Sequence, residues 1–154
     1  MYTDEFDYYR AGSVPEAVDL LGEHDGAKLL AGGHGLLTRM KVGEESAPAL
    51  VDISGLDELT GVERDGDVLR VGALASHADV ADDEAVGAGA QALADACREL
   101  GDLQVRNGGT LAGNLAHGDA RSDPPAAALA LDVSLVVHGI AGERTVSAAD
   151  LFEG

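Results

Sequence analysis

Two glycine-rich segments constrain the fold of this chain more than any other feature. Residues 29–37 read Leu-Leu-Ala-Gly-Gly-His-Gly-Leu-Leu, and a second double glycine, Gly108-Gly109, lies about 76 positions after the first. Glycine loses more conformational entropy on folding than any other residue. A fold that orders glycine in two places at this cost is expected to use the exposed backbone there, so we expect both segments to contribute to one site.

The first segment has the pattern of a strand that ends in a turn and re-enters a helix. Apolar residues stop at Gly32-Gly33 and resume at Leu36. Glycines can expose consecutive N–H groups to an anion, and a following helix adds partial positive charge, so a phosphate can be held without Lys or Arg. The alternative is a tight turn that uses glycine only for its dihedral angles, and this segment alone does not decide between the two.

The second segment, residues 106–118, is expected to be a glycine-rich loop. It is not a P-loop, because Lys-Ser/Thr does not follow Gly113, and it lacks the Gly-x-Gly-x-x-Gly spacing of dinucleotide-binding turns. A single loop of this kind is weak evidence for a ligand. Two such segments in one chain suggest a pyrophosphate gripped from both sides.

The remaining patterns predict short helices and strands in alternation. A capping box at Ser13 to Glu16 begins a helix over residues 14–24. The other expected elements are strands at 28–31 and 49–53, a short helix near 36–40, a hairpin of 59–63 with 68–72, helices at 88–100 and 124–131, and a hairpin of 133–137 with 144–146.

The charge of the chain argues against nucleic acid as a partner. Asp and Glu number 28 against 10 Lys and Arg, which gives a formal net charge of -18. Only Lys28 and Lys41 are lysines, and such an acidic, lysine-poor composition predicts a protein kept soluble in concentrated salt, that is, a halophilic one. An ordinary acidic cytosolic protein is the alternative.

The chain length and a few single residues limit the number of domains and the cofactors that the chain can hold. With 154 residues, of which 45% are hydrophobic, the chain suits one folded domain that has room for two lobes. Cys97 is the single cysteine, so this chain holds neither an internal disulfide nor an iron–sulfur cluster. We predict no bound metal, because no His and carboxylate group has ligand spacing, and no membrane segment or signal pattern, hence a cytoplasmic location.

Short motifs that follow one another along nearly the whole chain match a known family. In order they are Phe6-x-Tyr8, Ala31-Gly32-Gly33-His34, Val51-Asp52-Ile53, Val71-Gly72-Ala73-Leu74-x-x-His77-Ala78 and Gly101-Asp102-x-Gln104-Val105-Arg106-Asn107-x-Gly109-Thr110-Leu111-x-Gly113-Asn114-Leu115-Ala116-His117. This order resembles the FAD-binding medium subunit of molybdenum hydroxylases of the carbon monoxide dehydrogenase and xanthine dehydrogenase type. The stretch 102–116 is the most specific part of the match.

The resemblance implies a fold class and a set of site residues. The fold is α+β, a two-lobed FAD-binding domain of the vanillyl-alcohol-oxidase (PCMH) type, with a small α/β lobe over about residues 1–53 and an antiparallel sheet with helices over about 54–154. FAD lies between the lobes. The residues implied to contact it are Leu30, Ala31, Gly32, Gly33, His34, Gly35, Leu36, Leu37, Gly109, Thr110, Ala112, Gly113, Asn114 and Asp123.

Within that set, residues 30–37 would wrap the pyrophosphate and ribityl part and Asp123 would lie near the ribityl hydroxyls. His34 and His117 would flank the pyrophosphate, as ligands or merely as solvated side chains, whereas His77 is expected to be structural. Ala112 stands where the family usually has a second glycine, Gly35 where it usually has serine, and Ala11 where proline is common. The methyl of Ala112 is either tolerated or crowds the phosphate and weakens FAD binding.

The resemblance also implies a function, that of an oxidoreductase subunit without acid–base catalytic residues of its own. A molybdopterin large subunit hydroxylates the substrate, an iron–sulfur small subunit relays electrons, and this FAD reduces an external acceptor. The alternative is a shortened, non-catalytic FAD-binding or assembly module. It arises because the sequence stops before the C-terminal domain of the family, at Gly154.

Overall fold

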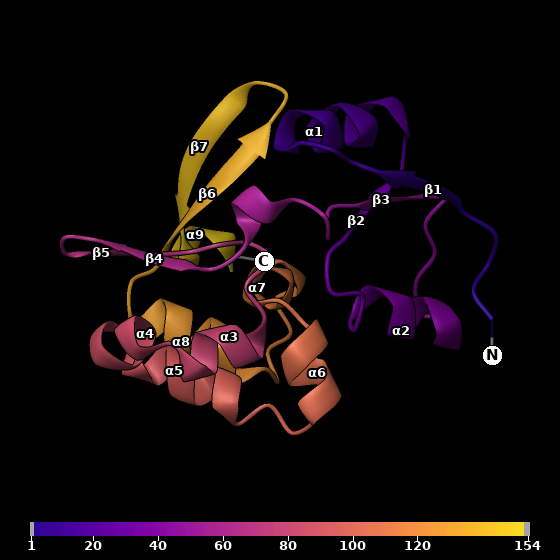
Figure 1. Cartoon of the computed structure of the whole chain (residues 1–154). Coiled ribbons are helices and arrows are strands. Elements are labelled where there is room, and N and C mark those ends of the chain that lie inside the picture. The colour runs from indigo at the N-terminus through magenta and orange to yellow at the C-terminus, as the bar shows by residue number, and fades with distance from the viewer. Residues whose placement is uncertain (1, 153–154) are drawn as a thin grey trace.

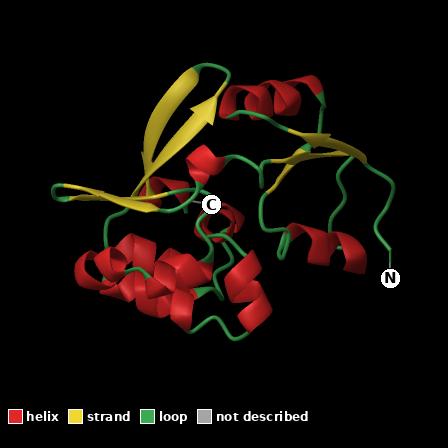
Figure 2. Cartoon of the chain, in the orientation of Figure 1, coloured by secondary structure: helices red, strands yellow, loops and turns green. Residues whose placement is uncertain are grey.

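The first part of the chain forms a small parallel sheet with one helix on each face. The computed structural model describes residues 2–152, and Figures 1 and 2 show its two parts. We call the first part the sheet lobe. Its elements are β1 (Asp7–Arg10), α1 (Val14–Glu23), β2 (Lys28–Leu30), α2 (Leu36–Val42) and β3 (Ala49–Asp52), with strand order β1-β3-β2 and both pairings parallel.

The central strand of the sheet lobe is buried on both faces, as parallel strands between two helices are. Leu50 packs on the α2 side with Met40 and Ala47. Val51 packs on the α1 side with Ala17. Because successive residues of a strand point to opposite faces, this one strand contributes to two small cores, and each core packs one helix against the sheet.

The helix predicted over residues 14–24 is confirmed as α1. The Ser13 hydroxyl accepts a hydrogen bond from the Glu16 N–H at 3.2 Å, and Pro15 occupies the first turn, where its missing N–H costs nothing. Strands β2 and β3 and helix α2 were also predicted. Strand β1 was not, because four residues that alternate little in polarity carry no clear period.

The rest of the chain, which we call the helical lobe, surrounds a second core with helices and two β-hairpins. Its elements are a 3₁₀ turn (Asp57–Leu59), β4 (Val62–Asp65), β5 (Val68–Val71), α3 (His77–Asp82), α4 (Glu84–Gly89), α5 (Gln91–Arg98), α6 (Leu103–Gly108), α7 (Leu111–His117), α8 (Asp123–Ala130), β6 (Ser134–Gly139), β7 (Gly142–Ser147) and α9 (Ala148–Leu151). Both predicted hairpins are present and antiparallel, but the first strand expected at 59–63 lies at 62–65, because residues 57–59 form the 3₁₀ turn. The mixture of helices and sheets confirms the α+β class (Figure 2).

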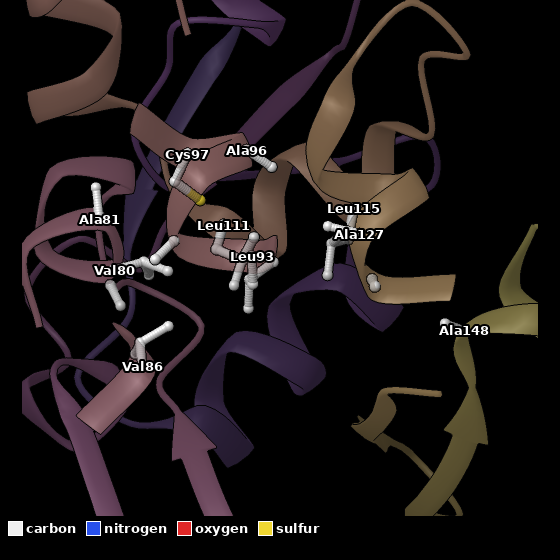
Figure 3. Packing of buried hydrophobic residues seen from close by; sticks show 13 residues of the cluster. Val80, Ala81, Val86, Leu93, Ala96, Cys97, Leu111, Leu115, Ala127 and Ala148 are labelled. Atoms are coloured by element: carbon white, nitrogen blue, oxygen red, sulfur yellow. The ribbon is translucent and has the colours of Figure 1, made fainter. Parts of the chain in front are cut away.

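The core of the helical lobe is built largely from small side chains. Val80, Val86, Leu93 and Leu111 are at most 5% exposed and come from four different helices (Figure 3). Alanines on α5 and α8 let these helices approach closely. Cys97 is fully buried here, and burial raises the pKa of its thiol to about 12, so the thiol stays protonated and inert.

Two predictions in this lobe are corrected by the structure. The helix expected over 88–100 is α5, which begins only at Gln91, because Ala90 is non-helical and separates it from α4. The expected glycine-rich loop at 106–118 is wrong, since that stretch forms the end of α6 and all of α7. Asp102 caps α6 by accepting from the N–H groups of Gln104 and Val105, and Thr110 caps α7 by accepting from the Gly113 N–H.

Candidate functional site

The backbone between β2 and α2 presents a run of free N–H groups. Residues 32–35, which we call the amide segment, form no hydrogen bond through their N–H groups to any atom of residues 2–152. The next amide with a partner is that of Leu37, which donates to the Gly33 oxygen at 3.0 Å. Gly33 has φ 75°, a conformation that favours glycine. Consecutive unpaired donors on a turn of this kind make an anion-binding concavity.

The second double glycine lies against the amide segment. A methyl group added at Gly32 would come 1.9 Å from the carbonyl oxygen of Gly108, and one added at Gly108 would come 2.3 Å from Nε2 of His34. Only glycine permits so close an approach of two backbones. The predicted convergence of the two segments is therefore confirmed, and Figure 1 shows α6 beside α2.

The amides around Gly109 are only partly available to a ligand. The Gly109 N–H donates to the Val105 oxygen at 2.7 Å, and the Leu111 N–H donates to the Ala75 oxygen at 3.0 Å. The Thr110 N–H has no partner within residues 2–152, while the Thr110 hydroxyl accepts from the Gly113 N–H at 3.2 Å. This segment thus offers fewer open donors than the amide segment does.

A side-chain contact brings Asn114 to the start of α8. Its Nδ2 and Oδ1 atoms lie 2.9 and 3.0 Å from the Ser122 hydroxyl oxygen. Asp123, exposed to solvent, follows directly. The contact joins α7 to the residue that precedes Asp123.

The apolar members of the predicted site use their side chains for packing. Leu30, Leu36 and Leu37 pack against the small core around Met40 and Leu50. Any contact of these three residues with a ligand would therefore come mainly from the backbone. Ala112 is half-buried in the first turn of α7.

A buried histidine supports the second segment from behind. The side chain of His77 is buried, with the residue 2% exposed, and the backbone N–H of His77 donates to the Gly109 oxygen at 3.1 Å. A methyl added at Gly109 would lie 3.1 Å from Cδ2 of this ring. Burial lowers the pKa of His77 and so favours the neutral ring, and its Nδ1 has no partner within residues 2–152.

Charged side chains that sequence reasoning missed connect the two lobes next to the amide segment. Arg39 of α2 donates through Nε to Glu45 at 2.9 Å, and its Nη1 lies 2.9 Å from Nε2 of His117 on α7. Lys28 forms a second ion pair with Glu45. These hydrogen bonds, from Lys28 first and then Arg39, lower the pKa of Glu45. Because a guanidinium can only donate, Nε2 of His117 is the acceptor in this contact.

Other features of the described surface lie elsewhere. Two open hollows are found near Pro48 and between α1 and the β6–β7 hairpin, away from the amide segment. Within residues 2–152 no group of three or more His, Cys, Asp or Glu side chains is placed to hold a metal ion. None of the helices there has the length and apolarity needed to cross a bilayer.

The fold is an α+β domain in which the turn after β2, with its free N–H groups, lies close to the end of α6. Residues 4–154 match the family described as "FAD binding domain in molybdopterin dehydrogenase", and the chain belongs to this family. It is 40% identical over 155 residues to the carbon monoxide dehydrogenase medium chain of Hydrogenophaga pseudoflava, covering 100% of this chain and 54% of that one.

Other relatives are named for different substrates. The glyceraldehyde dehydrogenase medium chain of Sulfolobus acidocaldarius is 35% identical over 154 residues, with 100% of this chain and 55% of the relative covered. Among solved structures, carbon monoxide dehydrogenase from Hydrogenophaga pseudoflava superposes with a TM-score of 0.96 at 41% identity, and quinoline 2-oxidoreductase from Pseudomonas putida 86 with 0.95 at 30%. Both structural matches cover 100% of this chain and 54% of the other, so this chain spans about half the length of its relatives.

Proposed function

We propose that this chain binds FAD between its two lobes as the flavin component of a molybdenum hydroxylase. The proposed contacts are the backbone of residues 30–37, the second segment at Gly109, Thr110, Ala112, Gly113 and Asn114, and the carboxylate of Asp123. The family to which the chain belongs supports the cofactor. The residues that hold it are proposed from the geometry.

One observation carries the proposal. The segment 32–35, whose N–H groups are free, approaches Gly108 of the other lobe through Gly32 and the ring of His34. A diphosphate has anionic oxygens on both sides and is bound well by donors that converge from two directions. The neighbouring polar groups at Asn114 and Asp123 suit the hydroxyls of a ribityl chain.

In the proposed assembly, electrons reach this domain from iron–sulfur clusters on a small subunit, after a molybdopterin large subunit has hydroxylated the substrate. Bound FAD supplies the ability to accept electrons singly and to deliver them in pairs to an external acceptor. The residues of this chain bind and orient the cofactor and provide no general acid or base. Relatives named for carbon monoxide, glyceraldehyde and caffeine show that the substrate differs across the family. A cytoplasmic location belongs to the same proposal.

The test is a titration of FAD into the purified protein, with flavin fluorescence as the readout. We expect saturable quenching at about one FAD per chain, competition by ADP, and much weaker binding of riboflavin, which lacks the diphosphate. An absence of any saturable change would overturn the cofactor assignment for this chain and favour an assembly module.

The proposed partners have a separate test. We expect the gene for this chain to be flanked by a reading frame for a large molybdopterin-binding protein and by a small one with eight cysteines. Co-expression of the three should yield a complex in which substrate reduces the bound flavin, as bleaching of its visible absorbance would report. A chain that binds FAD but never associates with such partners would contradict the electron-transfer role alone.

A further inference from the structure

We propose that Arg39 is the cationic contact for the diphosphate of the bound dinucleotide. The inference rests on the proposed function and adds to it a charged side chain that neither the sequence motifs nor the family description assigns. The amide segment supplies donors but no formal charge, whereas a diphosphate carries two negative charges. A positive group nearby would therefore strengthen the binding that the amides give, above all in a chain with a net charge of -18.

Glu45 fixes the orientation of the Arg39 guanidinium. Its Nε donates to Oε2 of Glu45 at 2.9 Å, and its Nη2 lies 2.8 Å from the same oxygen. Glu45 is held in turn by the ion pair with Lys28. A carboxylate that grips a guanidinium in this way fixes its plane and leaves the Nη1 end to point elsewhere.

The Nη1 end of the guanidinium lies beside the amide segment. Nη1 would be 3.6 Å from a methyl group added at Gly35, and it contacts Nε2 of His117 at 2.9 Å. One N–H of Nη1 serves His117, and the second has no partner within residues 2–152. The Arg39 side chain is 26% exposed, so a ligand can reach it without unfolding of either lobe.

The other basic groups of this region are less suited to the role. Lys28 is tied to Glu45 by its ammonium group. Arg121 is paired with Asp119 at 2.8 Å and its side chain is 89% exposed, so water screens its charge. Arg39 combines a fixed orientation, partial burial and an open donor next to the free amides.

The contact with His117 gives Arg39 a second effect as a positioning residue. His117 ends α7, whose first turn follows Thr110, and Arg39 lies on α2, which follows the amide segment. The Nη1 to Nε2 contact therefore fixes the separation of the two segments that we propose to grip the diphosphate.

The test compares FAD affinities of wild type, Arg39→Gln and Arg144→Gln, with flavin fluorescence as the readout. Arg144 is exposed on β7 and forms no ion pair within residues 2–152. Arg144→Gln therefore removes the same charge as Arg39→Gln, but at a position away from the proposed site. We expect Arg39→Gln to weaken binding about ten- to a hundredfold, the range for a hydrogen bond to a charged group, and Arg144→Gln to change it less than about twofold. The affinity for ADP should fall in Arg39→Gln by the same factor as the affinity for FAD.

The outcomes separate this inference from the proposed function. A wild type that does not bind FAD overturns the proposed function, whereas wild-type binding with equal affinities for Arg39→Gln and Arg144→Gln overturns only the role of Arg39. Added KCl should weaken FAD binding more in wild type than in Arg39→Gln. If Arg39→Gln does not fold, Arg39→Met is the second variant, because it removes the charge and keeps an unbranched side chain. An FAD affinity of that variant equal to that of wild type would refute the role of Arg39.

Discussion

At the scale of single residues, a hydrogen bond between Tyr8 and Asp52 anchors the strand end next to the amide segment. Asp52 ends β3 beside Leu30, accepts a hydrogen bond from the Tyr8 hydroxyl, and accepts another from the Ser54 N–H at 2.8 Å. Burial opposes ionisation of Asp52, but these hydrogen bonds outweigh it and lower the pKa of the carboxyl. The same bond, with desolvation second, raises the pKa of Tyr8.

The two shifts predict how pH affects this bond. A carboxyl with a lowered pKa stabilises the fold above its unfolded pKa of about 3.9, and that contribution is lost as pH falls through the folded value. A phenol with a raised pKa stabilises the fold below its unfolded pKa of about 10, and that contribution is lost as pH rises. We expect Tyr8→Phe to lower the free energy of unfolding most between about pH 5 and 9.

Urea denaturation at a series of pH values measures this effect. Tyr9→Phe is the control, because the Tyr9 ring stacks on His24 and its hydroxyl forms no hydrogen bond within residues 2–152. The difference between wild type and Tyr8→Phe should shrink below about pH 4 and above about pH 10. A difference that is the same at every pH would show that the hydroxyl does not stabilise the fold through Asp52.

At the scale of elements, the close approach of the turn after β2 to the end of α6 decides whether a site exists. We expect Gly32→Ala to lower the free energy of unfolding by about 1–3 kcal/mol or more, because its methyl would meet the Gly108 oxygen at 1.9 Å. Gly87→Ala is the control. Gly87 lies in α4 with no atom within 4 Å of an added methyl, so alanine there should raise stability by about 0.5–1 kcal/mol.

Urea denaturation of both variants checks these values, and FAD titration follows any that fold. Equal stability of Gly32→Ala and wild type would mean that the two turns do not meet as described. Loss of stability in Gly87→Ala as well would mean that any added methyl group disturbs this fold, and the comparison would then say nothing specific about Gly32.

The helices and strands also show which parts of the fold local sequence patterns predict correctly. The capping box at Ser13 and the alternation of apolar residues predict α1, β2 and β3 because these signals are local. Glycines at 108, 109 and 113 led instead to the prediction of a loop where α6 and α7 form. Caps at Asp102 and Thr110 and tertiary packing of Leu111 and Leu115 outweigh the helix penalty of those glycines.

At the scale of the whole molecule, the net charge of -18 is spread over a fold with few ion pairs to offset it. Among residues 2–152 the ion pairs of Lys and Arg with carboxylates involve Lys28, Arg39, Arg98 and Arg121. Mutual repulsion of the remaining acidic groups opposes the compact state, and added salt screens it within a few ångströms.

We therefore expect the melting temperature to be higher in about 2 M KCl than in about 0.1 M KCl. Thermal unfolding followed by circular dichroism measures this difference. A variant with the exposed residues Glu5, Asp82 and Glu99 changed to the corresponding amides should depend less on salt. A melting temperature that falls with KCl would count against the halophilic interpretation and would point to the ion pairs as the dominant charge effect.

The sequence by itself determined the family, the α+β class and the two backbone segments, because glycine doublets, caps and apolar periods are properties of neighbouring residues. Only the tertiary structure decided which amides are open, since Gly109 and Leu111 donate to partners inside the fold while residues 32–35 do not. It also decided that Arg39 reaches His117, a contact across 78 positions that no local pattern encodes. Hydrogen-bond partners and close approaches depend on contacts between residues that are far apart in the sequence, and the packing of the two lobes determines those contacts.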